Sequence, residues 1–206
     1  MRTTMKTEEM LLGFDCRQGV AGVAANWDAK RREAFLFRTD APQPLSTDTI
    51  VWPAILDDEL RPGACVGHQD LWSNLQCLEA CLQAHDIQVP NRGSLIAVTV
   101  HLSESDKVEW ELEKSAVPPT TPPVRDECWS FVGYDVSDKW LLSGLSNCGF
   151  IPSDDKEALR RRWSSKLNQY HLFANPEHAT QFRELSNRRA TEHSPFFVFG
   201  IWLIFP

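Results

Sequence analysis

An α+β fold, with a mixed or antiparallel sheet and three to four helices packed on it, is the fold class that this 206-residue sequence predicts. Runs rich in β-branched and aromatic residues, typical of strands, occur at 94–101 and 196–205. Apolar residues at helical spacing occur in 70–85 and again after residue 154. Because these elements follow one another without a regular βαβ rhythm, the pattern favours α+β over a parallel sheet.

The length and composition fit a single domain over residues 1–206. Hydrophobic residues make up 42% of the chain and charged residues 24%, which is ordinary globular usage and enough to bury a core. Residues 115–126 contain four prolines in twelve positions. They predict a surface loop or extended segment, which is the candidate boundary between two subdomains.

The first half of the chain predicts strands and one helix. Residues 11–38 predict one or two strands, and residues 50–55 predict a short one after a loop. Asp70 is expected to cap a helix that runs to about His85. The apolar residues of this helix share one face: Leu71, Leu75, Leu78 and Leu82.

The middle of the chain predicts an antiparallel pair of strands. Residues 94–101 contain the continuous apolar run LIAVTV, which is typical of a strand buried on both faces. Residues 107–114, KVEWELEK, alternate strictly, with Val108, Trp110 and Leu112 pointing one way and charged residues the other. We therefore predict two strands joined by a turn at 103–106.

The last third predicts two strands and three helices. Residues 128–134 predict a short strand, after which Asp135 or Ser137 is expected to cap a helix to about Ser146. Three elements follow, each with its own start signal: a helix from Asp154 to about Tyr170, a helix from Asn175-Pro176 to about Ala190, and a strand introduced by Pro195.

The six cysteines are expected to be mostly buried free thiols, because a chain of this length in a reducing cytoplasm does not need disulfides. Cys77, Cys81 and His85 fall at i, i+4 and i+8 of the predicted helix, and thiolate and imidazole are zinc ligands. The spacing is not that of a zinc finger. The sequence leaves both interpretations open, core residues or metal ligands, with no metal as the expectation.

Catalytic motifs are absent from the sequence. It has no GxxxxGK[ST], GxGxxG, HExxH or GxSxG pattern. The alternative is a small cysteine-dependent enzyme that uses Cys148 or Cys128, with His171 or His178 as the base. We predict no catalytic residue and no cofactor.

The charges are unevenly distributed. The formal net charge is −7, which disfavours a general nucleic-acid binder. Residues 101–138 carry nine acids and three bases, whereas residues 156–190 carry eight bases and three acids. A solvated face is the ordinary explanation of both segments. A regulatory protein that binds nucleic acid through 156–190 is a further, less favoured alternative.

The acidic segment supplies the candidate partner-binding residues. On the predicted strand, Glu109, Glu111 and Glu113 would form a stripe along one face that complements a cationic partner. The full candidate set adds the preceding turn and an upstream acidic cluster: Glu104, Asp106, Glu109, Glu111, Glu113, Asp57, Asp58 and Glu59.

Residues 128–150, CWSFVGYDVSDKWLLSGLSNCGF, carry a resemblance. An aromatic strand, Gly-Tyr-Asp, a short helix and Asn-Cys-Gly-Phe before a basic helix are similar to small bacterial proteins that look like immunity proteins of polymorphic (Rhs-type or type VI-secreted) toxins. The resemblance implies a cytoplasmic inhibitor that binds a toxin domain and blocks its active site. It implies no particular contact residue. The acidic charge balance, in turn, suits a toxin with a basic active-site surface, and we expect no direct nucleic-acid binding.

The location expected from the sequence is the cytoplasm. The first residues show no apolar stretch of signal-peptide length, and the apolar run 196–205 is too short to span a membrane. We expect no membrane association.

Overall fold

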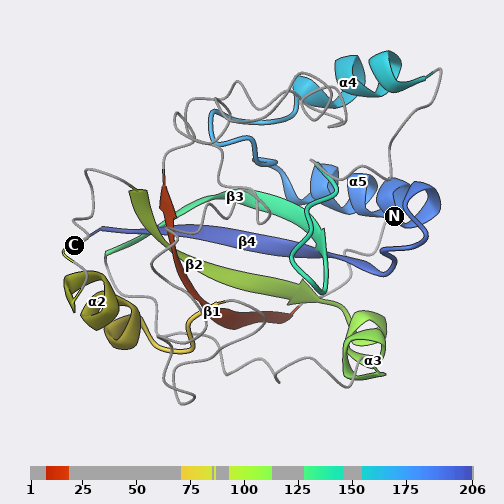
Figure 1. Ribbon diagram of the computed structural model, residues 1–206. Coiled ribbons are helices and arrows are strands. Elements are labelled where there is room, and N and C mark those ends of the chain that lie inside the picture. Colours follow the sequence, from red (N-terminus) through yellow and green to blue (C-terminus); the bar gives the residue numbers. More distant parts are fainter. Residues whose placement is uncertain are drawn as a thin grey trace.

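The computed structural model describes residues 8–18, 71–84, 86, 93–112, 128–145 and 155–205. These residues form a four-stranded antiparallel sheet in the order β1-β2-β4-β3 (Figure 1). The strands are β1 (Glu8–Gln18), β2 (Gly93–Leu102), β3 (Trp129–Asp138) and β4 (Phe196–Ile204). The helices in this part of the chain are α2 (Leu75–Ala84), α3 (Glu104–Leu112), α4 (Lys156–Ser164) and α5 (Pro176–Arg189). The predicted α+β class with an antiparallel sheet and four helices is confirmed.

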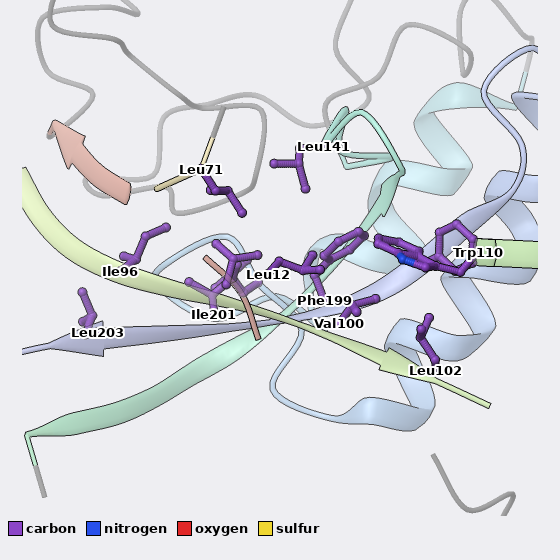
Figure 2. Packing of buried hydrophobic residues seen from close by; sticks show 13 residues of the cluster. Leu12, Leu71, Ile96, Val100, Leu102, Trp110, Leu141, Phe199, Ile201 and Leu203 are labelled. Carbon is purple, nitrogen blue, oxygen red and sulfur yellow. The ribbon is translucent and has the colours of Figure 1, made fainter. Parts of the chain in front are cut away.

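One face of the sheet is apolar along its two central strands, β2 and β4. The alternate residues Phe197, Phe199, Ile201 and Leu203 of β4 lie on it beside Ile96, Val98, Val100 and Leu102 of β2, and all are buried. Figure 2 shows Leu71, Leu141 and Trp110 reaching this face from outside the sheet. The Trp110 ring packs edge-on against Phe197, with 4.9 Å between the ring centroids. Burial of this face is the main hydrophobic contribution to the fold.

The opposite face is covered from two ends. Near the end of β4, Leu78 and Leu82 of α2 pack with Trp202 and Ile204. Near the start of β4, Phe182 of α5 packs against Trp163 of α4 and against Phe196 and Val198 of β4. Because β4 is buried on both faces, it is apolar at nearly every position.

β1 is held by a close backbone contact at Gly13. Phe14 and Trp72 exchange two backbone hydrogen bonds of 2.8 Å each. A Cβ atom on Gly13 would lie 2.6 Å from the Trp72 carbonyl oxygen. Only glycine allows this approach, which coincides with a shift in the β1–β2 register.

Several predicted elements are confirmed. Strand 94–101 is β2, strand 128–134 is the first part of β3, and strand 196–205 is β4. The helix predicted from Asn175-Pro176 is α5, and the Asn175 side chain accepts a hydrogen bond from the Glu177 backbone N–H, as an N-cap residue does.

The predicted strand at 107–114 is wrong, because Glu104–Leu112 is the helix α3. The turn proposed at 103–106 is its N-terminal cap. The Asp106 carboxylate accepts a bond from the Ser103 backbone N–H, and the Ser103 hydroxyl accepts one from the Asp106 N–H. This reciprocal capping box nucleates a helix in spite of the alternating pattern. β2 pairs instead with β1 and β4.

The predicted helix from Asp135 or Ser137 to Ser146 is also wrong, since β3 continues to Asp138 and a turn follows. Neither side chain caps a helix. The Asp135 carboxylate accepts bonds from the Val136 backbone N–H and the Ser143 hydroxyl, which stabilises the turn instead.

The helices α2 and α4 are present, but each begins or ends at a different residue from the predicted one. α2 begins at Leu75, after Asn74, whose side chain accepts a bond from the Gln76 N–H. Leu71 and Trp72 precede it in an extended segment. α4 ends at Ser164, well before Tyr170.

Several predictions fall on residues outside the described ranges. They are the strand at 50–55, most of the segment 11–38, and the proline-rich boundary at 115–126. The single-domain prediction therefore stays a prediction. None of the helices within the described ranges is long and apolar enough to cross a lipid bilayer.

Candidate protein-binding surface

A turn after β3 presents two apolar side chains to solvent. Trp140 is 51% exposed and Leu142 is 42% exposed. Between them, Leu141 is buried and adopts a left-handed backbone conformation with φ of 63°. A single left-handed leucine costs about 1–2 kcal/mol, so the surrounding contacts must hold this turn in place.

Asp138 supplies these contacts. One of its carboxylate oxygens accepts backbone N–H bonds from Trp140 (2.8 Å) and Leu142 (2.9 Å). The other oxygen lies 3.1 Å from Nδ1 of His193. Burial raises the pKa of Asp138 in spite of these bonds. The turn is thus anchored by a buried acid from the strand and a histidine from the loop before β4.

α3 is anchored nearby by a second buried acid. Asp106 is 3% exposed, and its carboxylate pairs with the Arg183 guanidinium of α5. Arg183 also donates from Nε to the Phe196 carbonyl oxygen at 2.7 Å. Burial alone would raise the pKa of Asp106, but the hydrogen bonds from Arg183 and Ser103 lower it overall.

The turn and α3 lie at the same end of the sheet. β2 ends at Leu102, immediately before α3, and Asp138 pairs in register with Phe196, the first residue of β4. Figure 1 shows both elements at the end of the sheet opposite α2. We call the following residues the β4-start surface: the exposed Val108, Trp140, Leu142, Glu8, Glu104, Glu109 and Glu192, and the half-buried Lys139.

Exposed apolar side chains are concentrated on this surface. Four large hydrophobic side chains are exposed within the described ranges, and three of them belong to it: Val108, Trp140 and Leu142. The fourth, Phe205, follows β4 at the other end of the sheet. Scattered apolar residues are ordinary on a protein surface, whereas a group of them at one place indicates an interaction site.

Some of the predicted partner-binding residues are exposed, one is buried, and others lie outside the described residues. Glu104 and Glu109 are exposed on α3, whereas Asp106 is buried and paired with Arg183. Glu111 lies on α3, so the proposed stripe of Glu109, Glu111 and Glu113 is wrong as geometry: successive helical residues turn by about 100° and do not share a face at spacing two. Glu113 and the cluster Asp57, Asp58 and Glu59 lie outside the described residues.

A second polar cluster lies inside the sheet, around Gly200. The Thr99 hydroxyl accepts a bond from the Trp202 indole N–H at 3.2 Å and donates to the Glu9 carboxylate at 3.0 Å. His101 Nε2 lies 3.7 Å from the same carboxylate. A Cβ atom on Gly200 would lie 2.5 Å from the Thr99 oxygen, so the side chains of the cluster leave no room for a larger residue at this position. It ties β1 to the two central strands.

The described cysteines differ in whether they form a disulfide. Cys77 is disulfide-bonded, so the expectation of free thiols fails there, and this residue is not a thiolate ligand for zinc. Cys16, Cys81 and Cys128 are not disulfide-bonded, and Cys128 is exposed. No group of three metal-binding side chains occurs in the described part of the chain. His85 and Cys148 lie outside it.

Sequence reasoning missed Val108 and Leu142 as surface residues. Val108 was expected to point inward from a strand, but it lies on the solvent face of α3. The signal that identifies this helix is Ser103-x-x-Asp106, the capping-box pattern ahead of an apolar residue. Leu142 was assigned to a helix, although Asp138 two residues before Trp140 is typical of an Asx turn.

Comparison of the chain with known protein families, characterised proteins and solved structures gives no match.

Proposed function

We propose that this chain is an immunity protein that binds a cognate bacterial toxin domain and blocks its active site. The observation that carries the proposal is the presentation of Trp140 on an anchored turn. Tryptophan is among the residues that contribute most to binding energy at protein interfaces. A side chain held in place before binding loses little conformational entropy when a partner covers it.

The position of Trp140 in the sequence also supports the proposal. The turn belongs to residues 128–150, whose sequence resembles immunity proteins of Rhs-type and type VI-secreted toxins, although the short helix included in that resemblance is a turn in the structure. The negative net charge suits a partner whose active site is basic, since opposite charges accelerate association and favour the correct partner.

The proposed place of action is the cytoplasm of the bacterium that produces the toxin. The disulfide at Cys77 weighs against this location, because structural disulfides are rare in a reducing compartment. Neutralisation requires only that the chain meets the toxin domain before the toxin reaches its substrate.

The test begins with the gene next to the one for this chain, which should encode a large secreted toxin. The toxin domain and this chain should co-purify, and the chain should abolish the toxin's activity. Trp140→Ala is expected to weaken the complex by about 2 kcal/mol or more, which is about 30-fold in Kd, as measured by calorimetry.

Phe205→Ala is the matched control, because it removes an equally exposed aromatic ring from the other end of the sheet. Its affinity should equal that of the unmodified chain. A metabolic operon around the gene, or a complex that Trp140→Ala leaves unchanged, would contradict the proposal.

A further inference from the structure

The β4-start surface has a distinctive composition, apolar in the middle and acidic around it. Val108 lies on the solvent face of α3 between Glu104, one turn before it, and Glu109, directly after it. Trp140 and Leu142 lie on the neighbouring turn. Exposed Glu192 belongs to the loop that carries His193, and His193 holds Asp138.

Buried contacts join the two halves of this surface. Arg183 binds Asp106 of α3 with its guanidinium and the carbonyl of Phe196 with Nε. Phe196 pairs in register with Asp138, which holds the turn. Because each connection is an ion pair, a hydrogen bond or a strand pairing, α3 and the turn are presented together as one preformed surface.

The positive groups at this end do not cancel its acids. Lys107 lies between Glu8 and Glu104 and forms ion pairs with both. Hydrogen bonds to Glu8 and then to Glu104 raise the pKa of Lys107 to about 12. The Arg183 charge is matched by Asp106. Lys139 lies over the Trp140 ring, 4.9 Å from its centroid. The surface carries four exposed glutamates against three bases, Lys107, Lys139 and the nearby exposed Arg188 in the last turn of α5, which is an excess of one acid.

We infer that the β4-start surface binds a partner protein with an apolar pocket for Trp140, and that lysine and arginine side chains surround this pocket. This inference rests on the proposed function. Charge complementarity selects this occupant, because an acidic or nucleic-acid surface would be repelled by the glutamates. The apolar centre supplies affinity once water is excluded, and the acidic rim speeds and orients the encounter.

The probe is a short amphipathic helical peptide of leucine and lysine, compared with the same peptide carrying glutamate in place of lysine. Binding to the full chain is followed by fluorescence anisotropy of the labelled peptide at low and high salt. The lysine peptide should bind more weakly as salt increases, and the glutamate peptide should not bind. Trp140→Ala should reduce the binding of the lysine peptide.

The decisive variant is Glu104→Gln/Glu109→Gln, which removes two charges from the rim without changing size. It should weaken binding of the lysine peptide about threefold to tenfold at low salt and less at high salt. The control Glu79→Gln/Glu177→Gln removes two exposed charges from α2 and α5 and should have little effect. Thermal unfolding of each variant establishes that it is folded.

An equal effect of the two double variants would overturn the inference, as would equal binding of both peptides or no binding of either. The toxin complex separates this failure from that of the proposed function. If Trp140→Ala breaks that complex while the rim variant leaves it unchanged, the partner chemistry is wrong and the immunity function stands. If the lysine peptide binds as expected and no toxin domain binds, the inferred docking surface is supported and the proposed immunity function is wrong.

Discussion

Two buried carboxylates hold the β4-start surface in place. Asp106 and Asp138 are each almost completely buried. The Asp106 carboxylate accepts bonds from the Ser103 backbone N–H and from Arg183, whereas Asp138 accepts two backbone N–H bonds and has His193 Nδ1 3.1 Å from its other oxygen. Their pKa values nevertheless move in opposite directions. Arg183 and Ser103 outweigh burial at Asp106, whereas burial dominates at Asp138. The Arg183 guanidinium is permanently charged, and its hydrogen bond to Asp106 favours the ionised carboxylate.

Replacing Asp106 with alanine should destabilise the protein by about 2–3 kcal/mol, because it leaves Arg183 without its buried partner and removes half of the capping box. Urea denaturation measures the change. Glu109→Ala, on the exposed face of the same helix, should stay within about 0.5 kcal/mol of the unmodified protein. Equal losses of stability at the two positions would show that the Asp106–Arg183 ion pair does not stabilise the folded protein.

The Asp106 contribution should also depend on pH. Its pKa is lowered from 3.8 in the folded protein, so the folded state binds this proton less tightly than the unfolded chain. The stabilisation is therefore complete above the ordinary value and is lost as pH falls through the lowered pKa. Asp106→Asn should lose less stability on acidification below that value than the unmodified protein does, as measured by denaturation at a series of pH values.

Gly200→Ala should destabilise the sheet by about 2 kcal/mol through overpacking. The new methyl group would meet the Thr99 hydroxyl at 2.5 Å and His101 Nε2 at 2.9 Å. The double variant Thr99→Ala/Gly200→Ala should cost less than the sum of the two single changes, because truncation of Thr99 makes room. Additive effects in thermal unfolding would contradict the close packing of this cluster.

At the scale of elements, α3 shows a conflict between side-chain pattern and local capping. KVEWELEK alternates as a strand does, yet Trp110 also lies four residues after Asp106 and both are buried, which is helical spacing. Over so short a window, residues 106–114 are compatible with both periods. The Ser103–Asp106 box decides for the helix, because it satisfies backbone groups that a strand would have to pair with a neighbour.

Ser103→Ala should cost about 1 kcal/mol and fray the first turn of α3. Ser103→Asp should retain most of the stability, since a carboxylate oxygen also accepts the Asp106 N–H. Amide hydrogen exchange measures the protection of residues 106–108 in each variant. Protection that is unchanged in Ser103→Ala would show that the cap does not set the helix start.

At the scale of the whole molecule, the sheet is buried on both faces, and its two ends differ. α2 closes one end with Leu78 and Leu82 against Trp202. The other end carries Val108, Trp140 and Leu142, three of the four large apolar side chains that are exposed in the described ranges, together with exposed glutamates. In the described part of the chain, the exposed apolar side chains therefore gather where β2 and β3 end and β4 begins, because core residues occupy the faces of the central strands.

The cross-link at Cys77 gives a prediction at this scale. Alkylation of the denatured protein before reduction should label Cys16, Cys81 and Cys128 and leave Cys77 unlabelled, as read by peptide mass spectrometry. Reduction before alkylation should expose Cys77 to the reagent. Labelling of Cys77 without reduction would rule out the disulfide and favour a reducing location for the chain.

Local chemistry in the sequence determined the α+β class, the strands at 94–101 and 196–205 and the start of α5, because continuous apolar runs and an Asn-Pro cap act without distant partners. Tertiary structure alone decided that Asp106 is buried by Arg183, 77 residues away, and that Val108, Trp140 and Leu142 share one end of the sheet. These outcomes depend on which strands become neighbours, and that pairing is set by the combined burial of all the strands and helices.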